Sequence, residues 1–210
     1  MWVVAGVIAV AAGGCSSAVG GLPISPSGSG TERSTPPPGS SSGGSSPSED
    51  NTYGAPRVSH PLDASRFLSR PCEVLTPAQL SALGVSKPGK ASTTGAIAEQ
   101  VGPSCAWTAD REVDSTIGVG FVTGNKHGLS DTYRGRPTFA YFEETTVDGY
   151  PAVFEDGVDS RPSGACNITV GISDTLTFGA GEVGGRKGQA SCDRAKQVAG
   201  AVIVTLKAGG

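Results

Sequence analysis

The sequence is poor in several residue types that would mark a common functional class. Aromatic residues make up 6% of its 210 positions, histidine occurs twice, and 16 Lys and Arg nearly balance 19 Asp and Glu. Because no basic stripe is present, we expect no nucleic-acid partner. No apolar run reaches the roughly 20 residues that a membrane-spanning helix needs. No two cysteines have the C-x-x-C spacing of many zinc and redox sites, so neither is expected.

A short apolar segment at the start of the chain ends in small residues and a cysteine. Residues 2–12 are almost all apolar, and the tripeptide Ala-Gly-Gly directly precedes Cys15. This arrangement is typical of a secretory signal, and a cysteine directly after the cleavage site indicates a bacterial lipobox. We therefore predict a signal peptide over residues 1–14 and a lipid on Cys15. The alternative is an ordinary secretory signal in which Cys15 has no special role.

Residues 15–60 are predicted to be a tether that begins at the lipidated cysteine. Residues 16–50 consist mostly of Ser, Gly, Pro and Thr. Such a composition offers too little apolar surface to offset the entropy of ordering, so a disordered segment is expected. By coil scaling, its ends would lie on the order of 35–40 Å apart.

Residues 61–210 have the patterns of a single domain with at least two helices. Thr76, Pro77 and Gln79 supply a capping box and a proline at the first helical position, and Gly84 can end the helix. Residues 191–207 carry apolar side chains at three- and four-residue spacing, which predicts an amphipathic helix. Its apolar stripe comprises Cys192, Ala195, Ala199, Val202, Ile203 and Leu206, with Arg194, Lys196 and Gln197 expected on the solvent face.

Alternating apolar and polar residues between these helices indicate β-strands. Strands are predicted at residues 105–108, 116–123, 145–147, 150–155, 165–173 and 176–180. The dipeptide Asp148-Gly149 favours a tight type I′ turn within one hairpin. Because the connections are too short for crossover helices, the strands should be antiparallel. The predicted fold class is α+β: an antiparallel sheet with helices packed on one face.

Four cysteines lie within this domain: Cys72, Cys105, Cys166 and Cys192. An even number of cysteines in an exported chain predicts disulfides. Three pairings are possible, and the sequence leaves a crossed pairing open. We predict the sequential pairing Cys72–Cys105 and Cys166–Cys192, which closes loops of roughly 25–35 residues. Each bond would then pin one helix to a strand.

A glycine-rich stretch, Gly179-Ala-Gly-Glu-Val-Gly184, matches the pattern G-x-G-x-x-G of dinucleotide-binding proteins. That chemistry requires a parallel βαβ unit and a helix that begins inside the motif. Here the predicted helix begins several residues later. We therefore interpret the stretch as a loop between a strand and a helix, and we expect no cofactor.

Candidate catalytic and metal-binding residues are few. His127 has Ser130 and Asp131 as neighbours, but the chain lacks a G-x-S-x-G nucleophile elbow, so a turn residue is the preferred interpretation. Paired carboxylates about 5–10 Å apart could hydrolyse a glycosidic bond, although a solvated rim is the simpler reading. The acidic residues around the predicted hairpin are Glu143, Glu144, Asp148, Glu155, Asp156 and Asp159. We assign no catalytic residue and no metal ligand.

The arrangement of the cysteines resembles a family of actinobacterial lipoproteins of unknown function (DUF3558). The resemblance rests on Pro71-Cys72 before the capped helix, Cys105-Ala-Trp107, Cys166 at the head of a strand, and Cys192 in the last helix. It covers about residues 71–206. The resemblance implies bacterial export, a lipobox, a tether and a four-cysteine domain, and it implies no activity, cofactor or catalytic residue.

Together these patterns predict an exported protein on the outer face of the cell membrane, attached through the lipid on Cys15. The leading hypothesis is a binding or accessory role toward an envelope protein, a lipid or a wall component. One alternative is a cell-envelope hydrolase that uses acidic residues. Another is a structural or assembly factor beside a secretion apparatus. A role without catalysis is preferred.

Overall fold

The computed structural model of the chain describes residues 51–110 and 115–209. These residues belong to one unit of the chain, Ser46–Gly210. The predicted signal peptide, Cys15 and the tether up to residue 50 lie outside the described residues. Within the described ranges, no helix is both long and apolar enough to cross a membrane.

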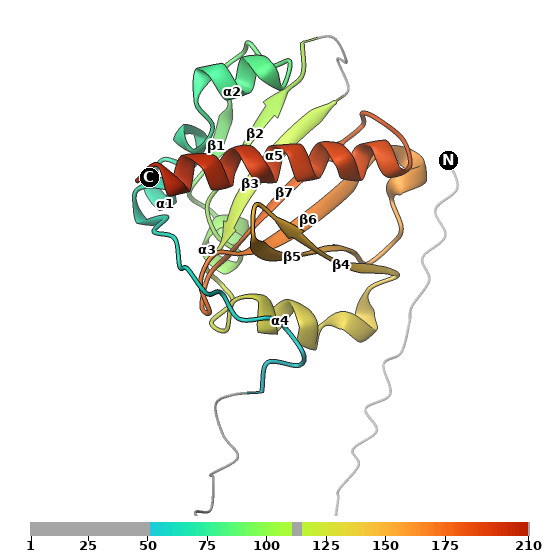
Figure 1. The fold of residues 1–210 in the computed structure, drawn as a ribbon. Helices are drawn as coiled ribbons and strands as arrows, with labels where there is room; N and C mark the ends of the chain where they lie inside the picture. The colour runs from blue at the N-terminus through green and yellow to red at the C-terminus, as the bar shows by residue number, and fades with distance from the viewer. Residues whose placement is uncertain (1–50, 111–114, 210) are drawn as a thin grey trace, which may run out of the picture. The chain divides into compact units, whose positions relative to one another are not determined.

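Seven strands form a single sheet in the order β1-β2-β3-β7-β6-β5-β4 (Figure 1). The strands are β1 (Lys90–Ser92), β2 (Ser104–Thr108), β3 (Thr116–Val122), β4 (Tyr141–Val147), β5 (Tyr150–Asp156), β6 (Cys166–Gly171) and β7 (Thr177–Val183). Every neighbouring pair is antiparallel, which confirms the predicted α+β class. The last strand in the sequence, β7, lies at the centre of the sheet between β3 and β6.

One long helix and several short ones surround this sheet. The α-helices are α1 (Ser65–Ser69), α2 (Pro77–Ala82), α3 (Ala96–Gln100), α4 (Leu129–Arg134) and α5 (Gln189–Lys207). Three 3-10 turns, Pro71–Val74, Arg136–Thr138 and Arg161–Ser163, connect other elements. The helices predicted near residues 77–83 and 191–207 are therefore present, as α2 and α5.

The long helix α5 crosses one face of the sheet (Figure 1), and the main core lies between the two. All six residues of the predicted apolar stripe are buried. The inward-facing positions of the strands supply the other half of the core, and Phe121 of β3 lies between Phe67 and Phe178, with ring centroids 6.4 Å from each. Burial of this stripe provides the main stabilisation of α5, because apolar area removed from water contributes roughly 25 cal/mol per Å².

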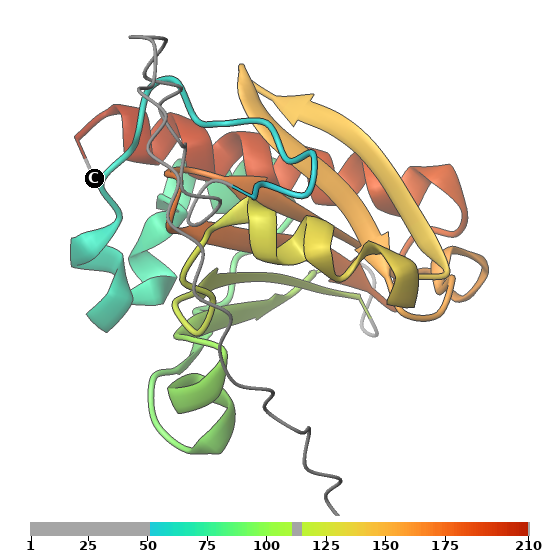
Figure 2. The same ribbon diagram turned by 90° about the horizontal axis from the view of Figure 1, so that it is seen from below.

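The short helix α4 lies on the other side of the sheet, as the view from below shows (Figure 2). Successive residues of a strand point to opposite faces, so Val153 of β5 points away from the main core. Val153 is buried in a second, smaller cluster with Leu129 and Tyr133 of α4 and with Ala55. This helix departs from the expected arrangement, in which the helices share one face.

Two local signals in the sequence have the predicted structures. At the start of α2, Thr76 Oγ1 accepts from the backbone N–H of Gln79, and the Gln79 side chain accepts in return from the Thr76 N–H. In the β4–β5 hairpin, Asp148 and Gly149 both have positive φ, of 48° and 89°. Two consecutive positive φ angles are what a type I′ turn requires.

The four domain cysteines form the two predicted disulfides, Cys72–Cys105 and Cys166–Cys192. The first joins the 3-10 turn before α2 to β2, and the second joins β6 to the first turn of α5. Each bond therefore holds a helical segment against the sheet, as the sequential pairing implied.

The residues just before the predicted domain boundary also contact the domain. The sequence analysis assigned residues 51–60 to the tether, yet Ala55 and Val58 are buried. The backbone N–H of Val58 donates to Asp174 Oδ1 at 3.1 Å, and Tyr150 donates its hydroxyl to the His60 carbonyl at 2.9 Å. These two buried side chains and the hydrogen bonds hold residues 51–60 against the domain. The composition of this segment is too polar for a folded element to be predicted from its sequence.

Candidate functional site

The glycine-rich stretch forms part of a central strand and not only a loop. This strand was predicted to end at residue 180, whereas β7 continues to Val183, so Gly181 joins Gly179 within it. Gly179 pairs with Gly120 of β3, and Gly181 pairs with Gly118. An antiparallel strand in mid-sheet cannot present a helix N-terminus to a pyrophosphate. The stretch thus lacks the geometry of the dinucleotide-binding motif, and the interpretation of Gly181 as a loop residue was wrong.

These four glycines share the face of the sheet that α5 does not cover. A shallow groove of about 300 Å³ runs across this face, between β2, β3, β7 and β6. Its lining includes Ser104, Ala106 and Asn167 beside three of the glycines, Gly118, Gly120 and Gly181. The groove offers a flat surface of small side chains and few charged groups.

A buried carboxylate follows directly in the same stretch. Glu182 of β7 has only 1% of its surface exposed and points to the core side of the sheet. Its Oε1 accepts from the Ser115 hydroxyl at 3.0 Å and from Arg186 Nη1 at 3.0 Å, while Oε2 accepts from the Arg186 N–H at 3.3 Å. Because a buried charge is costly without partners, these contacts explain how Glu182 is tolerated.

The loop after β7 passes over this carboxylate because it contains a glycine at the closest point. A Cβ added to Gly185 would lie 2.5 Å from Glu182 Cδ and 2.7 Å from Ser115 Oγ. No side chain could fit in that space without moving both groups. Gly185 therefore lets the backbone turn back and place Arg186 against Glu182.

A second arginine lies on the other side of Glu182. The sequence analysis placed Arg194 on the solvent face of the last helix, but Arg194 is buried, with 8% of its surface exposed. Its Nη2 donates to the Leu83 carbonyl, and its Nε lies 3.9 Å from Glu182 Oε1. The prediction was wrong because Leu83, the residue that follows α2, lies against this part of α5, which the helical periodicity of α5 alone cannot reveal.

The two arginines line a polar cleft of about 600 Å³ between the end of α2, the end of β2 and the loop that leads into α5. Asp110 also lines the cleft, and its Oδ1 accepts from the backbone N–H and the hydroxyl of Ser86 at 3.1 and 2.8 Å. The remaining lining comes mainly from the end of α2, at Ser81, Ala82, Leu83 and Gly84. This arrangement can bind charged or hydrogen-bonding groups.

One signal in the sequence could have revealed this cluster. Leu176, Phe178 and Ala180 occupy alternate positions of the predicted strand at residues 176–180, and Glu182 continues the same phase. Extending the strand by two residues would have placed a carboxylate on the buried face, where it requires cationic or hydrogen-bonding partners. The nearby Arg186 would then have been the first candidate.

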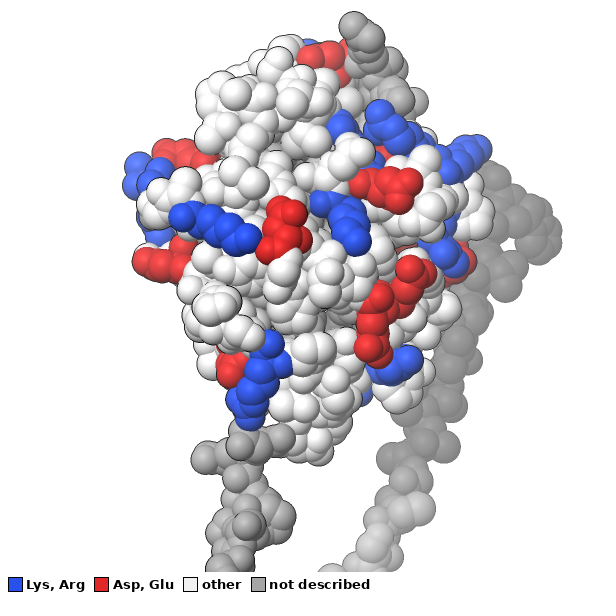
Figure 3. Space-filling model, viewed as in Figure 1, with Lys and Arg blue, Asp and Glu red and all other residues white. Residues whose placement is uncertain are grey.

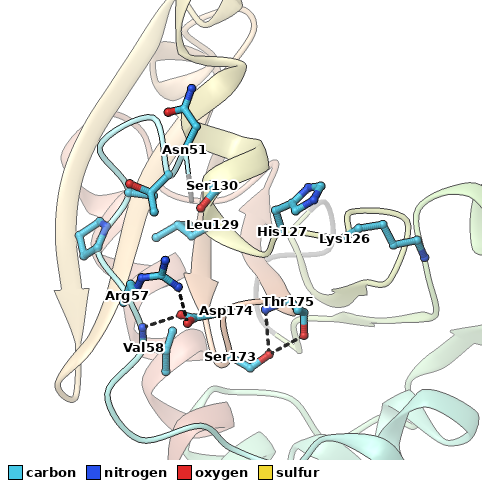
Figure 4. Close-up of a pocket in the computed structure, with 13 residues that line it drawn as sticks. Asn51, Arg57, Val58, Lys126, His127, Leu129, Ser130, Ser173, Asp174 and Thr175 are labelled. Atoms are coloured by element: carbon cyan, nitrogen blue, oxygen red, sulfur yellow. Dashed lines mark hydrogen bonds and ion pairs between the residues drawn. The ribbon is translucent and has the colours of Figure 1, made fainter. Parts of the chain in front are cut away.

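A smaller cavity of about 200 Å³ lies between residues 51–58, the start of α4 and the β6–β7 turn (Figure 4). Arg57 Nη1 lies 3.1 Å from Asp174 Oδ2, whereas the Lys126 side chain points away from that pair (Figure 4). The hydrogen bonds from the Val58 N–H and from Arg57 hold the pKa of Asp174 below its ordinary value. The cavity is therefore lined by groups that fasten residues 51–58 to the domain.

His127 and Asp131 form a pair in this region without completing a catalytic triad. His127 Nδ1 lies 3.3 Å from Asp131 Oδ1. Burial acts to raise the pKa of Asp131, but hydrogen bonds from the backbone N–H groups of His127 and Lys126 outweigh it, and the pKa lies below its ordinary value. Among the contacts of the described residues, none joins the Ser130 hydroxyl to the His127 ring, whose side chain is 68% exposed. Asp131 stabilises the turn before α4, in agreement with the interpretation of His127 as a turn residue.

The acidic residues of the β4–β5 hairpin are held by separate hydrogen bonds within the domain. Glu143 and Glu144 are consecutive in β4, and so are Glu155 and Asp156 in β5, so the members of each pair point to opposite faces. Their hydrogen-bond partners are also separate. In β4, Glu143 accepts from Tyr141 and Glu144 accepts from Arg136. In and after β5, Glu155 accepts from Asn167 and Thr169, Asp156 accepts from the backbone N–H groups of residues 158 and 160, and Asp159 accepts from Arg161. Burial raises the pKa of Glu155, against the opposing effect of its two hydrogen bonds.

Charge and potential metal ligands are dispersed over the part of the chain that the structure describes. No group of three or more His, Cys, Asp or Glu side chains there is arranged to hold a metal ion. On the face seen in Figure 3, Lys and Arg alternate with Asp and Glu, and neither sign dominates.

The fold and its cleft define a class: an α+β domain held by two disulfides, with an arginine-lined polar cleft. The chain belongs to the family described as a protein of unknown function (DUF3558), which it matches over residues 10–205. The family resemblance inferred from the cysteine pattern is thereby confirmed. No curated protein and no solved structure matches the chain significantly.

Proposed function

We propose that this protein is an exported bacterial lipoprotein, of the actinobacterial type, whose domain has a binding or accessory role at the outer face of the cell membrane. The lipid on Cys15 would anchor it, and residues 16–50 would act as the tether. A tether of this kind raises the local concentration of the domain near the membrane without imposing one orientation. The two disulfides of the domain support export, because such bonds persist in oxidising compartments.

One observation carries the binding role: guanidinium groups and hydrogen-bonding groups line the polar cleft. Ser115 contacts the Glu182 carboxylate, but both residues are almost completely buried. The hairpin carboxylates of Glu143, Glu144 and Glu155 each have a hydrogen-bond partner of their own within the domain, which does not favour the hydrolase alternative. The envelope ligand would be a protein, a lipid or a wall component.

The anchor is tested by partitioning between a detergent phase and an aqueous phase. The full chain expressed in its bacterial host should enter the detergent phase, and Cys15→Ser should move it to the aqueous phase. Ser17→Ala, two residues away, is the matched control and should partition as the unchanged chain does. If Cys15→Ser remains in the detergent phase, lipidation at this residue is wrong.

The binding role is tested with the unanchored full chain carrying Cys15→Ser. Added to isolated cell-envelope fractions, it should sediment with them in a saturable manner and release no soluble fragments. A hydrolase would instead release fragments in amounts that grow with time and that fall in Glu143→Gln or Glu155→Gln. Such a time course would contradict the proposed role.

A further inference from the structure

The arginine cleft has an uneven distribution of charge that bears on what it can bind. Two guanidinium groups, those of Arg186 and Arg194, share one carboxylate, that of Glu182. Guanidinium groups form strong, often bidentate hydrogen bonds with carboxylates and phosphates. The chemistry of the cleft therefore depends on which of these groups a ligand can reach.

Glu182 cannot be reached. It is 1% exposed, its Oε1 accepts two hydrogen bonds, and its Oε2 accepts one. It acts as a buried counter-charge that holds Arg186 in place. A cationic ligand in the cleft would find this carboxylate occupied.

Arg186, in contrast, remains available. Its side chain is 43% exposed, and Nη1 is its one guanidinium nitrogen with an acceptor among the described residues. The N–H groups of Nε and Nη2 are left for a ligand. Since Glu182 and the backbone turn at Gly185 already fix the position of Arg186, a ligand would lose less binding energy to ordering this side chain.

Asp110 is the acidic residue in the lining of the cleft. Its Oδ1 accepts from the backbone N–H and the hydroxyl of Ser86. An anionic group would be repelled by the Asp110 carboxylate and attracted to the two guanidinium groups. A negative charge in the cleft would therefore lie beside the arginines.

We propose that this cleft binds the oxyanion group of a ligand, a phosphate or a carboxylate, through Arg186 with Arg194 beside it. The assignment rests on the binding role proposed above and names the chemical class of its ligand. Arg186 donates hydrogen bonds to the oxyanion, and Glu182 holds Arg186 in position. Arg194 contributes positive charge from below the surface.

The test uses the full chain with Cys15→Ser and inorganic phosphate or citrate as the probe, with chloride at equal ionic strength as the reference. Binding is followed by calorimetry and by the midpoint of thermal unfolding, which a ligand that binds only the folded state raises. We expect a rise with phosphate or citrate that chloride does not reproduce. An identical response to all three salts would overturn the proposal.

Three variants make the test specific. Arg186→Gln should weaken binding by about tenfold or more, because it removes charge-assisted hydrogen bonds. Arg136→Gln, an exposed arginine that also pairs with a glutamate, is the matched control and should bind normally. Asp110→Asn keeps the acceptor for Ser86 and removes the repelling charge, so it should tighten binding by about two- to fivefold. Unchanged affinity in Arg186→Gln would refute the site.

Vesicles distinguish the possible sources of the oxyanion. Sedimentation with phosphatidylglycerol vesicles but not phosphatidylcholine vesicles, lost in Arg186→Gln, would assign a lipid phosphate, whereas binding of soluble phosphate or citrate alone would assign a free ligand. If none of these probes binds while the protein still sediments with envelope fractions, the oxyanion site is wrong and the general binding role stands.

Discussion

Removing the two disulfides, first singly and then together, should lower the stability of the domain by two similar and additive amounts. The bonds join residues 33 and 26 positions apart in the sequence. In the chain-entropy model, loops of these sizes correspond to about 3.7 and about 3.5 kcal/mol of stabilisation at 25 °C. Because the loops 72–105 and 166–192 share no residues, the two effects should add to about 7 kcal/mol.

The surroundings of the cysteines modify these values. Cys72 is half-buried, whereas Cys166 and Cys192 are buried in the core. Replacement of the second pair by alanine should therefore add about 1 kcal/mol for lost packing. Since domains of this size are commonly stable by about 5–15 kcal/mol, the variant without either bond should lie close to unfolding at 37 °C.

Urea unfolding followed by circular dichroism measures these differences, with Cys72→Ala/Cys105→Ala, Cys166→Ala/Cys192→Ala and the fourfold variant. The reduced wild-type chain is the control and should unfold near the fourfold variant. If removing either disulfide lowers the free energy of unfolding by less than about 1 kcal/mol, that disulfide does not restrict the denatured chain as the chain-entropy model requires. A fourfold variant no less stable than one double variant would refute the independence of the two loops.

Two further substitutions test local features. Glu155→Gln keeps the acceptor for Asn167 and should raise the midpoint of thermal unfolding at pH 7. The pKa of Glu155 is raised above its ordinary 4.5, so its ionisation destabilises the fold as the pH rises through the folded-state pKa. The difference between variant and wild type should vanish below about pH 4.5, and a constant difference across the pH range would contradict the assignment. Gly128→Ala should cost about 2 kcal/mol in urea unfolding, because φ is +52° and the added Cβ would lie 2.9 Å from the Asp174 backbone. Gly157→Ala, where a Cβ meets nothing within 4 Å, should leave stability unchanged, and equal effects of the two substitutions would rule out this explanation.

The features that the sequence predicted correctly are those encoded within a few neighbouring residues. The capping box at Thr76 and Gln79 forms because both hydrogen bonds join groups three residues apart. The turn at Asp148-Gly149 forms because these residues tolerate positive φ. The apolar stripe of α5 is buried because helical periodicity alone collects its members on one side. Short elements without such a signal, such as β1 and α3, were missed.

The sequential pairing of the disulfides was predictable only in part from the sequence. The sequence supplied four cysteines and three possible pairings, and loop length favoured one of them. The folded chain satisfies that pairing because the 3-10 turn at Pro71–Val74 lies against β2, and α5 lies against β6. Neither contact follows from the local sequence.

The candidate site depended on tertiary structure throughout. Glu182, Arg186 and Arg194 meet only because β7 enters the centre of the sheet and Leu83, after α2, lies against the first half of α5. Hydrophobic periodicity assigns a charged residue to the solvent side of its own helix, and it contains no information about a distant segment that covers that side. Local sequence thus determined which elements this chain forms, whereas long-range packing decided which of its charges are buried together, since burial is a property of contacts between segments far apart in the chain.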